Sequence, residues 1–446
     1  MIAVLGRQWS KRLRSFRHGV HPDTHKETTS SLPIEHMPLV DEYVVPLSQH
    51  AGAPGRACVE VGQRVRRGER IADPDGHRSV ALHSPVAGTV EAIELRPHPA
   101  GGLSPAMVLR TDRYADQSLA SAAPCDPQDH AATLAQIQAA GVVGLGGAAY
   151  PAHAKLALPE GARVDVVILN GAECEPYLTA DHRLMVEHTR AVLGGLEVMM
   201  ELVGAGQGRV GIEANKPDAI EAMQAACGGD ARMAVVPLRV KYPEGAKQMM
   251  IEAVTGHRPP LGGRSFDAHV TIHNVGTSAA IHDACVAGEP MVDRVVTVTG
   301  DAVRRPANVR VPIGTRLSDL LEHCGGLLPE ARHVVMGGAM MGQSQASLDV
   351  PVVKATTGVL ALTAEVEPWP EEPCIRCGQC LDACAMFLNP TRLAAAARAG
   401  DVEVLRDGHA RACFECGSCA FVCPSHIPLT ALIRTGKELV WKAGSK

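Results

Sequence analysis

Two runs of cysteines near the C-terminus have residue types and spacing that suit redox chemistry. The runs are Cys374-Ile-Arg-Cys377-Gly-Gln-Cys380-Leu-Asp-Ala-Cys384 and Cys413-Phe-Glu-Cys416-Gly-Ser-Cys419-Ala-Phe-Val-Cys423. In this C-x2-C-x2-C-x3-C spacing, three thiolates bind one 4Fe–4S cluster and the fourth cysteine binds the other cluster. The sequence therefore predicts one cluster on Cys374, Cys377, Cys380 and Cys423, and a second on Cys413, Cys416, Cys419 and Cys384.

The alternative for these cysteines is a zinc ribbon, which has two cysteine pairs but no third or fourth cysteine at these offsets. The second run ends before Pro424, whereas the first has Ala385 at that place, so the two turns need not be alike. The other six cysteines are scattered: Cys58, Cys125, Cys174, Cys227, Cys285 and Cys324. Because cluster ligands are reduced thiolates, the sequence favours a reducing, cytosolic setting over a disulfide framework.

A second candidate functional segment is the glycine-rich stretch from Gly144 to Lys155, which contains Gly146, Gly147 and Tyr150. Backbone N–H groups of such a loop can approach a phosphate closely, and a lysine adds charge. The segment also fits G-x-G-x-x-A, but that dinucleotide fingerprint follows a strand. Here a helix is predicted over 131–140, so a simple NAD(P)-binding Rossmann motif is disfavoured. A purely structural turn remains the other interpretation.

The elements after this loop predict where a cofactor would lie. Residues 164–169 form a short apolar strand that leads into Asn170, Glu173 and Glu175. Ligands of open α/β sheets bind at the carboxyl ends of strands. An amide and two acids suit the ribityl hydroxyls and ring edge of a flavin, or a nicotinamide ribose. A polar turn at 241–247 and a predicted strand at 269–277 continue an alternation of helices and strands that indicates a doubly wound sheet.

Composition and charge disfavour nucleic-acid binding and a membrane-spanning segment. The 446 residues suit about three domains. A net charge of −5 offers no basic footprint for nucleic acid, and no run of apolar residues is long enough to span a membrane. The N-terminus lacks the apolar core of a signal peptide. Its basic residues could face an anionic membrane surface, a partner or solvent: Lys11, Arg12, Arg14 and Arg17.

The predicted organisation has five parts. Residues 1–54 form an N-terminal extension whose prolines exclude a long helix, and whose histidines are interpreted as structural rather than metal-binding. Residues 55–115 resemble a biotinyl/lipoyl-type barrel-sandwich hybrid, without a carrier lysine because none occurs between Lys26 and Lys155. The fold class predicted for the whole chain is multidomain α/β, with an α/β cofactor domain at 131–290 and a β-grasp module at 291–362 after the sandwich. An acidic, Pro-rich segment at 365–373 begins the cluster domain at 365–440, an α-helical ferredoxin.

These motifs carry a resemblance to known families. Gly144–Lys155 resembles the G-x-G-G-A-G-F-P-T-x-x-K loop of the flavin-bearing, NADH-oxidising subunit of respiratory complex I, and Asn170–Pro176 is similar to its N-A-D-E-x-E-P segment. From Arg17 to the second cysteine run, the chain resembles the RnfC component of the Rnf ion-translocating electron-transport complex, including a soluble-ligand-binding-type (SLBB) β-grasp.

The resemblance implies a peripheral NADH:ferredoxin-type oxidoreductase subunit on the cytoplasmic face of the inner membrane. It implies non-covalent FMN, NADH as substrate, ferredoxin, and membrane-bound partner subunits including a ferredoxin-like Fe–S subunit. By position, Gly144, Gly146, Gly147 and Lys155 would line the FMN phosphate and ring. Asn170, Glu173, Tyr242, Gly245, Asn274 and Thr277 would hold the flavin, and Tyr150 and Glu175 would face NADH.

Three departures from the complex I pattern concern this site. Tyr150 occupies a position that is usually Phe in that family, and Ala172 occupies a position where complex I has Asp. Ala246 and Lys247 replace an acidic pair. Hydride transfer needs no acid–base residue of the protein, so none is assigned. A soluble flavin/Fe–S corrinoid (cobalamin) reductase is the alternative enzyme, and a flavin-free electron-wire or scaffold subunit is the alternative from another class.

Overall fold

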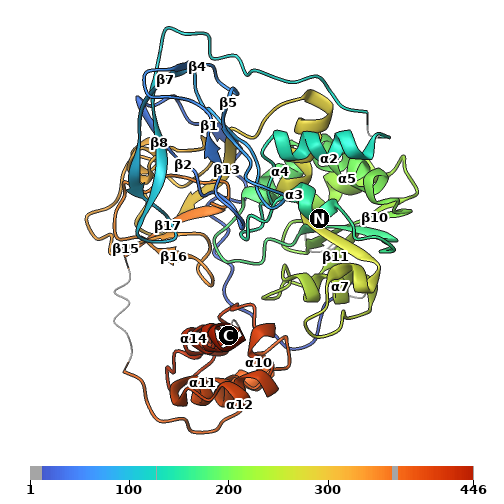
Figure 1. Cartoon of the computed structure of the whole chain (residues 1–446). Coiled ribbons are helices and arrows are strands. Elements are labelled where there is room, and N and C mark those ends of the chain that lie inside the picture. Colours follow the sequence, from blue (N-terminus) through green and yellow to red (C-terminus); the bar gives the residue numbers. More distant parts are fainter. Residues whose placement is uncertain (1–12, 127, 364–369, 445–446) are drawn as a thin grey trace.

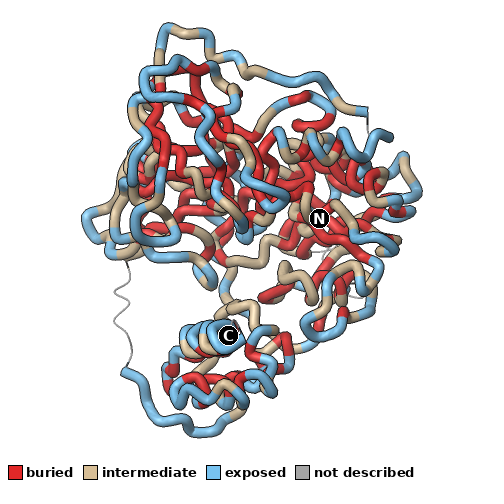
Figure 2. The backbone as a smooth tube through the Cα atoms, viewed as in Figure 1, coloured by how far each residue is buried: buried red, intermediate tan, exposed pale blue. Residues whose placement is uncertain are grey.

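The computed structural model describes residues 13–126, 128–363 and 370–444. Separate hydrophobic cores lie in a β-sandwich, an α/β domain, a mixed β-sheet domain and a helical C-terminal domain. Figure 1 shows the C-terminal cluster domain below the other three, and Figure 2 shows that buried residues form the interior of each part. Lys11, Arg12 and the acidic residues at 364–369 lie outside the described residues. Within the described part of the chain, no helix has the length and apolar character to cross a bilayer.

The sandwich consists of two small antiparallel sheets. The first has the order β2 (Glu42–Pro46), β8 (Leu103–Thr111), β7 (Gly88–Pro97) and β4 (Arg64–Val65), and the second β3 (Arg56–Ala57), β5 (Arg70–Asp73) and β6 (Leu82–His83). Tyr43 and Val45 of β2 are buried in the same core as Leu109 of β8. The sandwich therefore starts earlier than residue 55, the predicted boundary, because β2 completes its sheet.

The α/β domain is built on a parallel sheet with the order β11 (Met233–Leu238), β10 (Gln207–Glu213), β9 (Val166–Gly171) and β12 (Val270–Asn274). Its helices are α2 (His130–Ala139), α3 (Ala152–Leu156), α4 (Ala180–Glu187), α5 (Thr189–Val203), α6 (Pro217–Cys227), α7 (Lys247–Thr255) and α8 (Val275–His282). The strand order reverses between β9 and β12, and ligands bind at such switch points.

Two predicted elements of this domain have different bounds. The helix expected over 181–204 is divided at His188 into α4 and α5. The strand expected over 269–277 ends at Asn274, because the Asn274 side chain accepts hydrogen bonds from the N–H groups of Gly276 and Thr277 and so caps α8.

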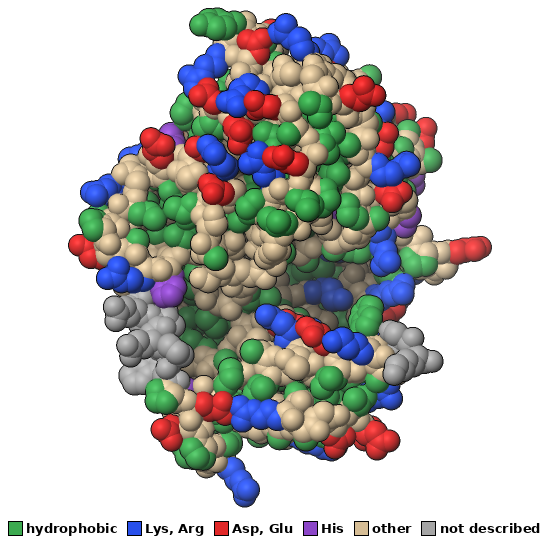
Figure 3. Space-filling model, turned by 60° about the vertical axis from the view of Figure 1, so that its left-hand side comes forward, with side chains coloured by type: hydrophobic (Ala, Val, Ile, Leu, Met, Phe, Trp, Pro, Cys, Tyr) green, Lys and Arg blue, Asp and Glu red, His purple; other side chains and the backbone are tan. Residues whose placement is uncertain are grey.

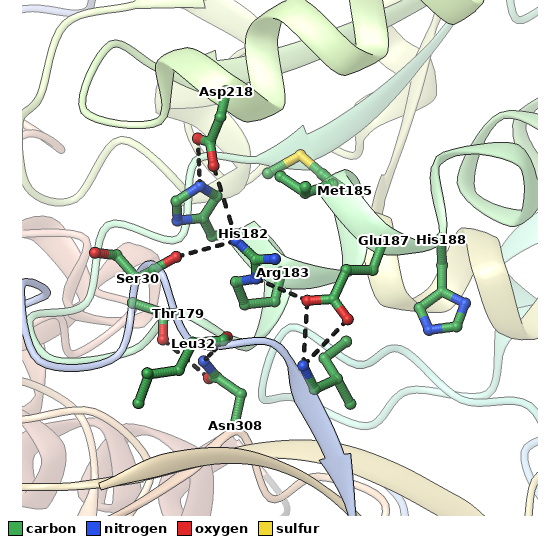
Figure 4. Close-up of polar contacts among 12 residues, drawn as sticks. Ser30, Leu32, Thr179, His182, Arg183, Met185, Glu187, His188, Asp218 and Asn308 are labelled. Atoms are coloured by element: carbon green, nitrogen blue, oxygen red, sulfur yellow. Dashed lines mark hydrogen bonds and ion pairs between the residues drawn. The ribbon is translucent and has the colours of Figure 1, made fainter.

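The β-grasp domain has a six-stranded sheet that includes a strand from the N-terminus. Its order is β1 (Ile34–His36), β14 (Ala307–Pro312), β13 (Asp293–Thr299), β17 (Gly358–Leu362), β15 (His333–Met336) and β16 (Gln343–Ser344), with helix α9 (Leu317–His323). β1 pairs in parallel with β14. Figure 4 shows Arg183 and Glu187 of α4 beside β1, and Glu187 accepts a hydrogen bond from the Ile34 N–H at 3.1 Å.

Residues 13–36, which we call the N-terminal strap, connect three domains. Phe16 packs in the core of the cluster domain, Val20 bridges to Tyr242 of the α/β domain, and β1 joins the β-grasp sheet. His18 bonds the Asp382 carbonyl at 2.8 Å. The segment predicted as an extension is therefore part of the domain interfaces.

The cluster domain consists of α10 (Gln379–Ala383), α11 (Pro390–Ala399), α12 (Val402–Asp407), α13 (Ser418–Phe421) and α14 (Leu429–Gly444). Asn389 caps α11 by accepting from the Arg392 N–H, and Gly400 ends it with a φ of 68°. Leu393 of α11 and Ile433 of α14 are buried together. This packing forms the helical framework that carries the two cysteine runs.

Candidate cofactor sites

The structure brings the eight cysteines together in the two crossed sets that the spacing predicts. Cys384 of the first run lines one cavity of about 30 Å³ together with Cys413, Cys416 and Cys419 of the second run. We call these four the inner set. The pKa of Cys380 is raised by burial and by its neighbours Cys423, Cys377 and Cys374, which together with Cys380 form the outer set. Cys374 and Cys377 are exposed, so the outer set lies at the surface.

The two cysteine runs have the same backbone conformation at equivalent positions. Arg376 and Glu415 have φ of 56° and 64°, and Gly378 and Gly417 both have φ of 82°. Because left-handed conformations are costly for residues with side chains, their repetition at equal offsets indicates a conformation that both runs require. The three N-terminal cysteines of each run are thereby turned toward a common point.

The inner set fits a cluster chemically. The Leu388 and Glu415 N–H groups donate to the sulfurs of Cys384 and Cys413, each at 3.4 Å. Hydrogen bonds to cluster sulfurs tune the charge and potential of such sites. Burial raises the pKa of Cys413 to about 11, so the metal's charge is needed to hold this thiol ionised. Among the described residues, no three His, Cys, Asp or Glu side chains converge closely enough for a single metal ion.

The glycine-rich loop lies between α2 and α3. The Leu145 N–H donates to Thr277 Oγ1 at 2.8 Å, and the Gly144 N–H donates to the Tyr150 carbonyl at 2.8 Å. Gly146 and Gly147 are exposed, and Gly147 has a φ of +106°. The loop is thus fixed at both ends and presents bare backbone between them, as an approaching phosphate requires.

The carboxyl ends of β9 and β12 lie next to this loop. Asn170 and Asn274 are direct neighbours in the strand register. Asn170 Nδ2 donates to the Gly245 carbonyl at 2.8 Å. A Cβ on Gly146 would lie 3.4 Å from the Asn274 Cβ, so the loop and this strand end are in contact. The structure therefore places Asn170, Gly245, Asn274, Thr277 and the glycine loop around the switch point of the sheet.

Lys155 projects from α3 and donates to the Ile272 carbonyl of β12. Burial, with repulsion from Lys247 as a smaller cause, lowers its pKa to about 8. A dianionic phosphate beside these two ammonium groups would offset both effects. The donor set at this end of the loop therefore fits the phosphate of FMN.

Three further residues predicted to contact flavin or NADH, namely Glu173, Glu175 and Tyr242, also form hydrogen bonds within the protein. The oxygens of Glu173 accept from the Asp181 and His182 N–H groups at the start of α4, at 2.7 and 3.1 Å. Glu175 Oε2 accepts from the Met340 N–H of the β-grasp domain at 2.9 Å, and burial raises its pKa. Tyr242 is 1% exposed, and its hydroxyl lies 3.2 Å from Glu175 Oε1 and 2.7 Å from the Cys416 carbonyl. Tyr150 is half-buried at the end of the glycine loop.

Several residues at this site were not predicted from the sequence. Asp181 Oδ2 accepts from Asn274 Nδ2 at 2.6 Å, and Cys174 Sγ accepts from the Gly245 N–H at 3.3 Å. Lys26 of the strap donates to the carbonyls of Glu175 and Leu178. In the sequence, Asp181 reads as an ordinary acid in the first turn of a helix, and Lys26 is far from the site along the chain.

Comparison with known families agrees with this architecture. Models of four families match consecutive parts of the chain: an RnfC barrel-sandwich hybrid domain over 14–114, a Nuo51 FMN-binding domain over 137–283, an SLBB domain over 295–344 and a 4Fe–4S dicluster domain over 373–428. The predicted fold class is confirmed by these matches.

Full-length relatives agree as well. The chain is 43% identical over 85% of its length to the C component of the proton-translocating ferredoxin:NAD+ oxidoreductase complex of Clostridium ljungdahlii, of which it covers 84%. It is 40% identical over 85% of its length to the Na+-translocating counterpart of Acetobacterium woodii, of which it covers 86%. The C component of an ion-translocating oxidoreductase complex of Pseudomonas aeruginosa is 42% identical over 85% of the chain, which spans 50% of that relative.

Proposed function

The chain belongs to the RnfC family of ion-translocating oxidoreductase complexes, and from this premise we propose that it transfers electrons between NADH and a protein partner. The transfer uses FMN and two 4Fe–4S clusters. The observation that carries the proposal is the contact between the two sites, in which Tyr242 of the FMN-binding domain bonds the carbonyl of the cluster residue Cys416. A site for a hydride acceptor and a site for a one-electron carrier thus adjoin each other.

Gly144, Gly146, Gly147 and Lys155 would hold the phosphate and ring of FMN, and the side chains at the ends of β9 and β12 would hold the rest of the flavin. FMN supplies the conversion between the two electrons of a hydride and the single electrons that clusters carry. The half-buried ring of Tyr150 is available to stack on NADH. Glu175 and Tyr242 are assigned to the contact between the flavin site and the inner set.

The positions of the two sets give an order of transfer. The inner set adjoins the FMN-binding domain, whereas the outer set has exposed cysteines. The exposed apolar side chains of Ile375 and Leu381 directly follow outer-set cysteines, and exposed Phe421 lies two residues before Cys423. We assign the inner cluster to exchange with the flavin and the outer cluster to exchange with the partner. Figure 3 shows a hollow between the cluster domain and the rest of the molecule on one face.

The partners are other subunits of the complex, among them a ferredoxin-like Fe–S subunit, with ferredoxin as the distant acceptor or donor. The relatives' names mention ferredoxin and NAD+. We propose peripheral attachment at the cytoplasmic face of the cell membrane. High-salt or alkaline washing should then release the chain from membranes, and retention through both treatments would contradict this placement.

Family membership favours this function over a soluble corrinoid reductase. Cofactor analysis distinguishes the proposed function from that of a flavin-free electron-wire subunit. The protein purified without oxygen should contain about one FMN and about eight irons with equal sulfide, as two 4Fe–4S clusters require. Addition of NADH should bleach the flavin. Full iron and sulfide without flavin would support the electron-wire alternative, and flavin that NADH does not bleach would exclude NADH as the substrate.

A further inference from the structure

A second cavity, of about 110 Å³, lies behind the glycine loop between the FMN-binding and β-grasp domains. Leu145 of the loop and Gly276 and Ala280 of α8 form one side of it, and Asp181 of α4 lines it as well. Glu289, which also lines the cavity, is exposed to solvent. The cavity therefore reaches from the immediate neighbourhood of the proposed flavin site to the surface.

Asp181 is placed at the flavin-side wall by Asn274, whose Nδ2 donates to Asp181 Oδ2 at 2.6 Å. Arg294, also on the wall, donates to the Leu145 carbonyl at 2.7 Å and the Lys354 carbonyl at 2.6 Å, while its Nε has no acceptor among the described residues. Burial, and then the charge of Glu173, raise the pKa of Asp181 to about 7. Such a group takes up and releases protons near neutral pH.

Other charged groups face the same cavity from each surrounding element. They are His188 after α4, Asp283 after α8, Glu289 and Asp293 before and in β13, and Arg310 of β14. The hydrogen bond from Asn274 and the charges of Arg294 and Lys216 act in the opposite direction to burial and lower the pKa of Asp181. Asp293 is paired with Arg310 at 2.9 Å and Arg67 at 3.5 Å, and Asp283 lies 3.2 Å from His282 Nδ1. Glu289 is the exposed acid at the outer end of this lining. The cavity volume of about 110 Å³ is well above the roughly 10–15 Å³ that one water needs, so the cavity has room for water beside these polar partners.

The proposed function creates a need for such a path. Oxidation of NADH yields NAD+, one proton and two electrons. The clusters carry only the electrons, so one proton per NADH must leave the flavin site for solvent. In the opposite direction of flow, one proton must enter.

Building on the proposed function, we propose that the cavity behind the glycine loop is a water-filled proton path, with Asp181 as the proton-carrying group at its inner end. The Asp181 carboxylate forms an O–H bond with the proton that the site gives up. It then breaks that bond by transfer to cavity water, which passes the proton outward past Glu289. The carboxylate is restored and no electron moves in this step.

The test uses the holoprotein in single turnovers with NADH, with flavin absorbance and a pH-indicator dye recorded together. Asp181→Asn keeps the bond from Asn274 but cannot carry a proton. The proton leaves when the clusters take the electrons from the reduced flavin, so we expect proton release in this variant to lag the recovery of flavin absorbance after bleaching, with a rate about 10²-fold lower, the usual size of a lost proton-transfer group. Ala280→Leu, which keeps every carboxyl and narrows the cavity, should slow release as well. The control Glu197→Gln alters an exposed acid outside the cavity lining and should leave release unchanged.

A second readout does not depend on NADH. Infrared pH titration of the oxidised holoprotein should show a protonated carboxyl band that titrates near neutral pH and is absent from Asp181→Asn. If the band is unchanged in that variant, or if release keeps pace with flavin reoxidation in both Asp181→Asn and Ala280→Leu, the proton path is wrong. If wild-type protein binds flavin that NADH does not bleach, the proposed function fails while the infrared result still decides the role of Asp181.

Discussion

The hydroxyl of Tyr242 lies 2.7 Å from the backbone carbonyl oxygen of Cys416 and donates a hydrogen bond to it. The same hydroxyl lies 3.2 Å from Glu175 Oε1. A phenol has one hydrogen, so Tyr242 donates to one of these oxygens at a time. Glu175 in turn accepts from the Met340 N–H of the β-grasp domain. Three domains therefore meet at the inner set of cysteines, and Tyr242 is one of the side chains by which the flavin domain contacts the cluster domain.

Tyr242→Phe should lower the reduction potential of the inner cluster. The substitution removes a donor beside Cys416, and donors near a cluster stabilise the negative charge gained on reduction. One hydrogen bond is worth about 0.5–1.5 kcal/mol, which corresponds to roughly 20–60 mV for one electron. Redox titration followed by electron paramagnetic resonance measures the shift.

Tyr114→Phe is the matched control, because Tyr114 is fully exposed just after the last strand of the sandwich. An unchanged inner-cluster potential in Tyr242→Phe would show that this contact has no influence on the cluster.

Gly146→Val should abolish FMN binding without unfolding the protein. Gly146 is exposed, and a Cβ there would be 3.4 Å from the nearest side-chain atom, so the flavin-free chain can accommodate it. The larger side chain would occupy the place from which a phosphate approaches the backbone. Flavin content and iron content of the purified variant measure the effect, and iron should stay at the wild-type level.

Gly206→Val is the control for this loop, since nothing lies within 4 Å of its Cβ position and it is remote from the loop in sequence. Full FMN content and NADH oxidation in Gly146→Val would remove the glycine loop from the flavin site.

Cys423→Ser should damage the outer cluster and spare the inner one. Cys423 comes from the second run, yet it raises the pKa of Cys380 of the first run, so it lies with the outer set. Cys384→Ser should do the reverse, because Cys384 lines the inner cavity. Spectra of both variants, compared with Cys374→Ser and Cys413→Ser, assign each ligand. A Cys423→Ser spectrum like that of Cys413→Ser would mean that each run binds its own cluster.

The spacing of the cysteines predicted the two sets because cluster ligands are local in sequence and the crossed fourth ligand belongs to the motif. The glycine loop and the polar ends of β9 and β12 were predictable for a similar reason, since each is a continuous stretch with its own pattern. The contacts of Glu175 and Tyr242 were not. They depend on how the cluster domain docks, and the Tyr242–Cys416 bond joins residues 174 positions apart. No local pattern records such a contact.

The contacts of the N-terminal strap could not be predicted from the sequence for the same reason. The prolines and histidines of residues 18–54 predicted irregular structure, but pairing of Ile34–His36 with β14 needs a partner strand about 270 residues later. A three-residue strand has no periodicity of its own to reveal it.

Lys354 gives a prediction about pH and stability. Its side chain is 1% exposed, and its ammonium group donates to the carbonyls of Ala81 at 3.2 Å and Gly141 at 2.6 Å, so one lysine joins the β-grasp domain to two others. Burial lowers its pKa to about 7. Between pH 7 and about 10.5 the unfolded chain therefore binds a proton that the folded chain has released, and stability rises with pH across this window.

Lys354→Met should remove that rise. The difference in unfolding free energy between wild-type and variant protein should change from pH 7 to pH 10, by up to about 1.4 kcal/mol per pH unit at its steepest. Thermal unfolding without oxygen at a series of pH values measures it. Lys442→Met, at an exposed position of α14, is the control. A difference that is constant with pH would show that Lys354 does not change its protonation there.

The most direct test of the account is rapid mixing of the oxidised protein with NADH, followed by flavin absorbance and freeze-quenched electron paramagnetic resonance. The central claim is that electrons pass from NADH through the flavin to the inner cluster and then to the outer one. It predicts that the flavin bleaches first, the inner-cluster signal follows, and the outer-cluster signal appears last. In Cys416→Ser, the flavin should still bleach while reduction of the outer cluster by NADH is lost or greatly slowed. Reduction of the outer cluster at the wild-type rate in Cys416→Ser would contradict the account.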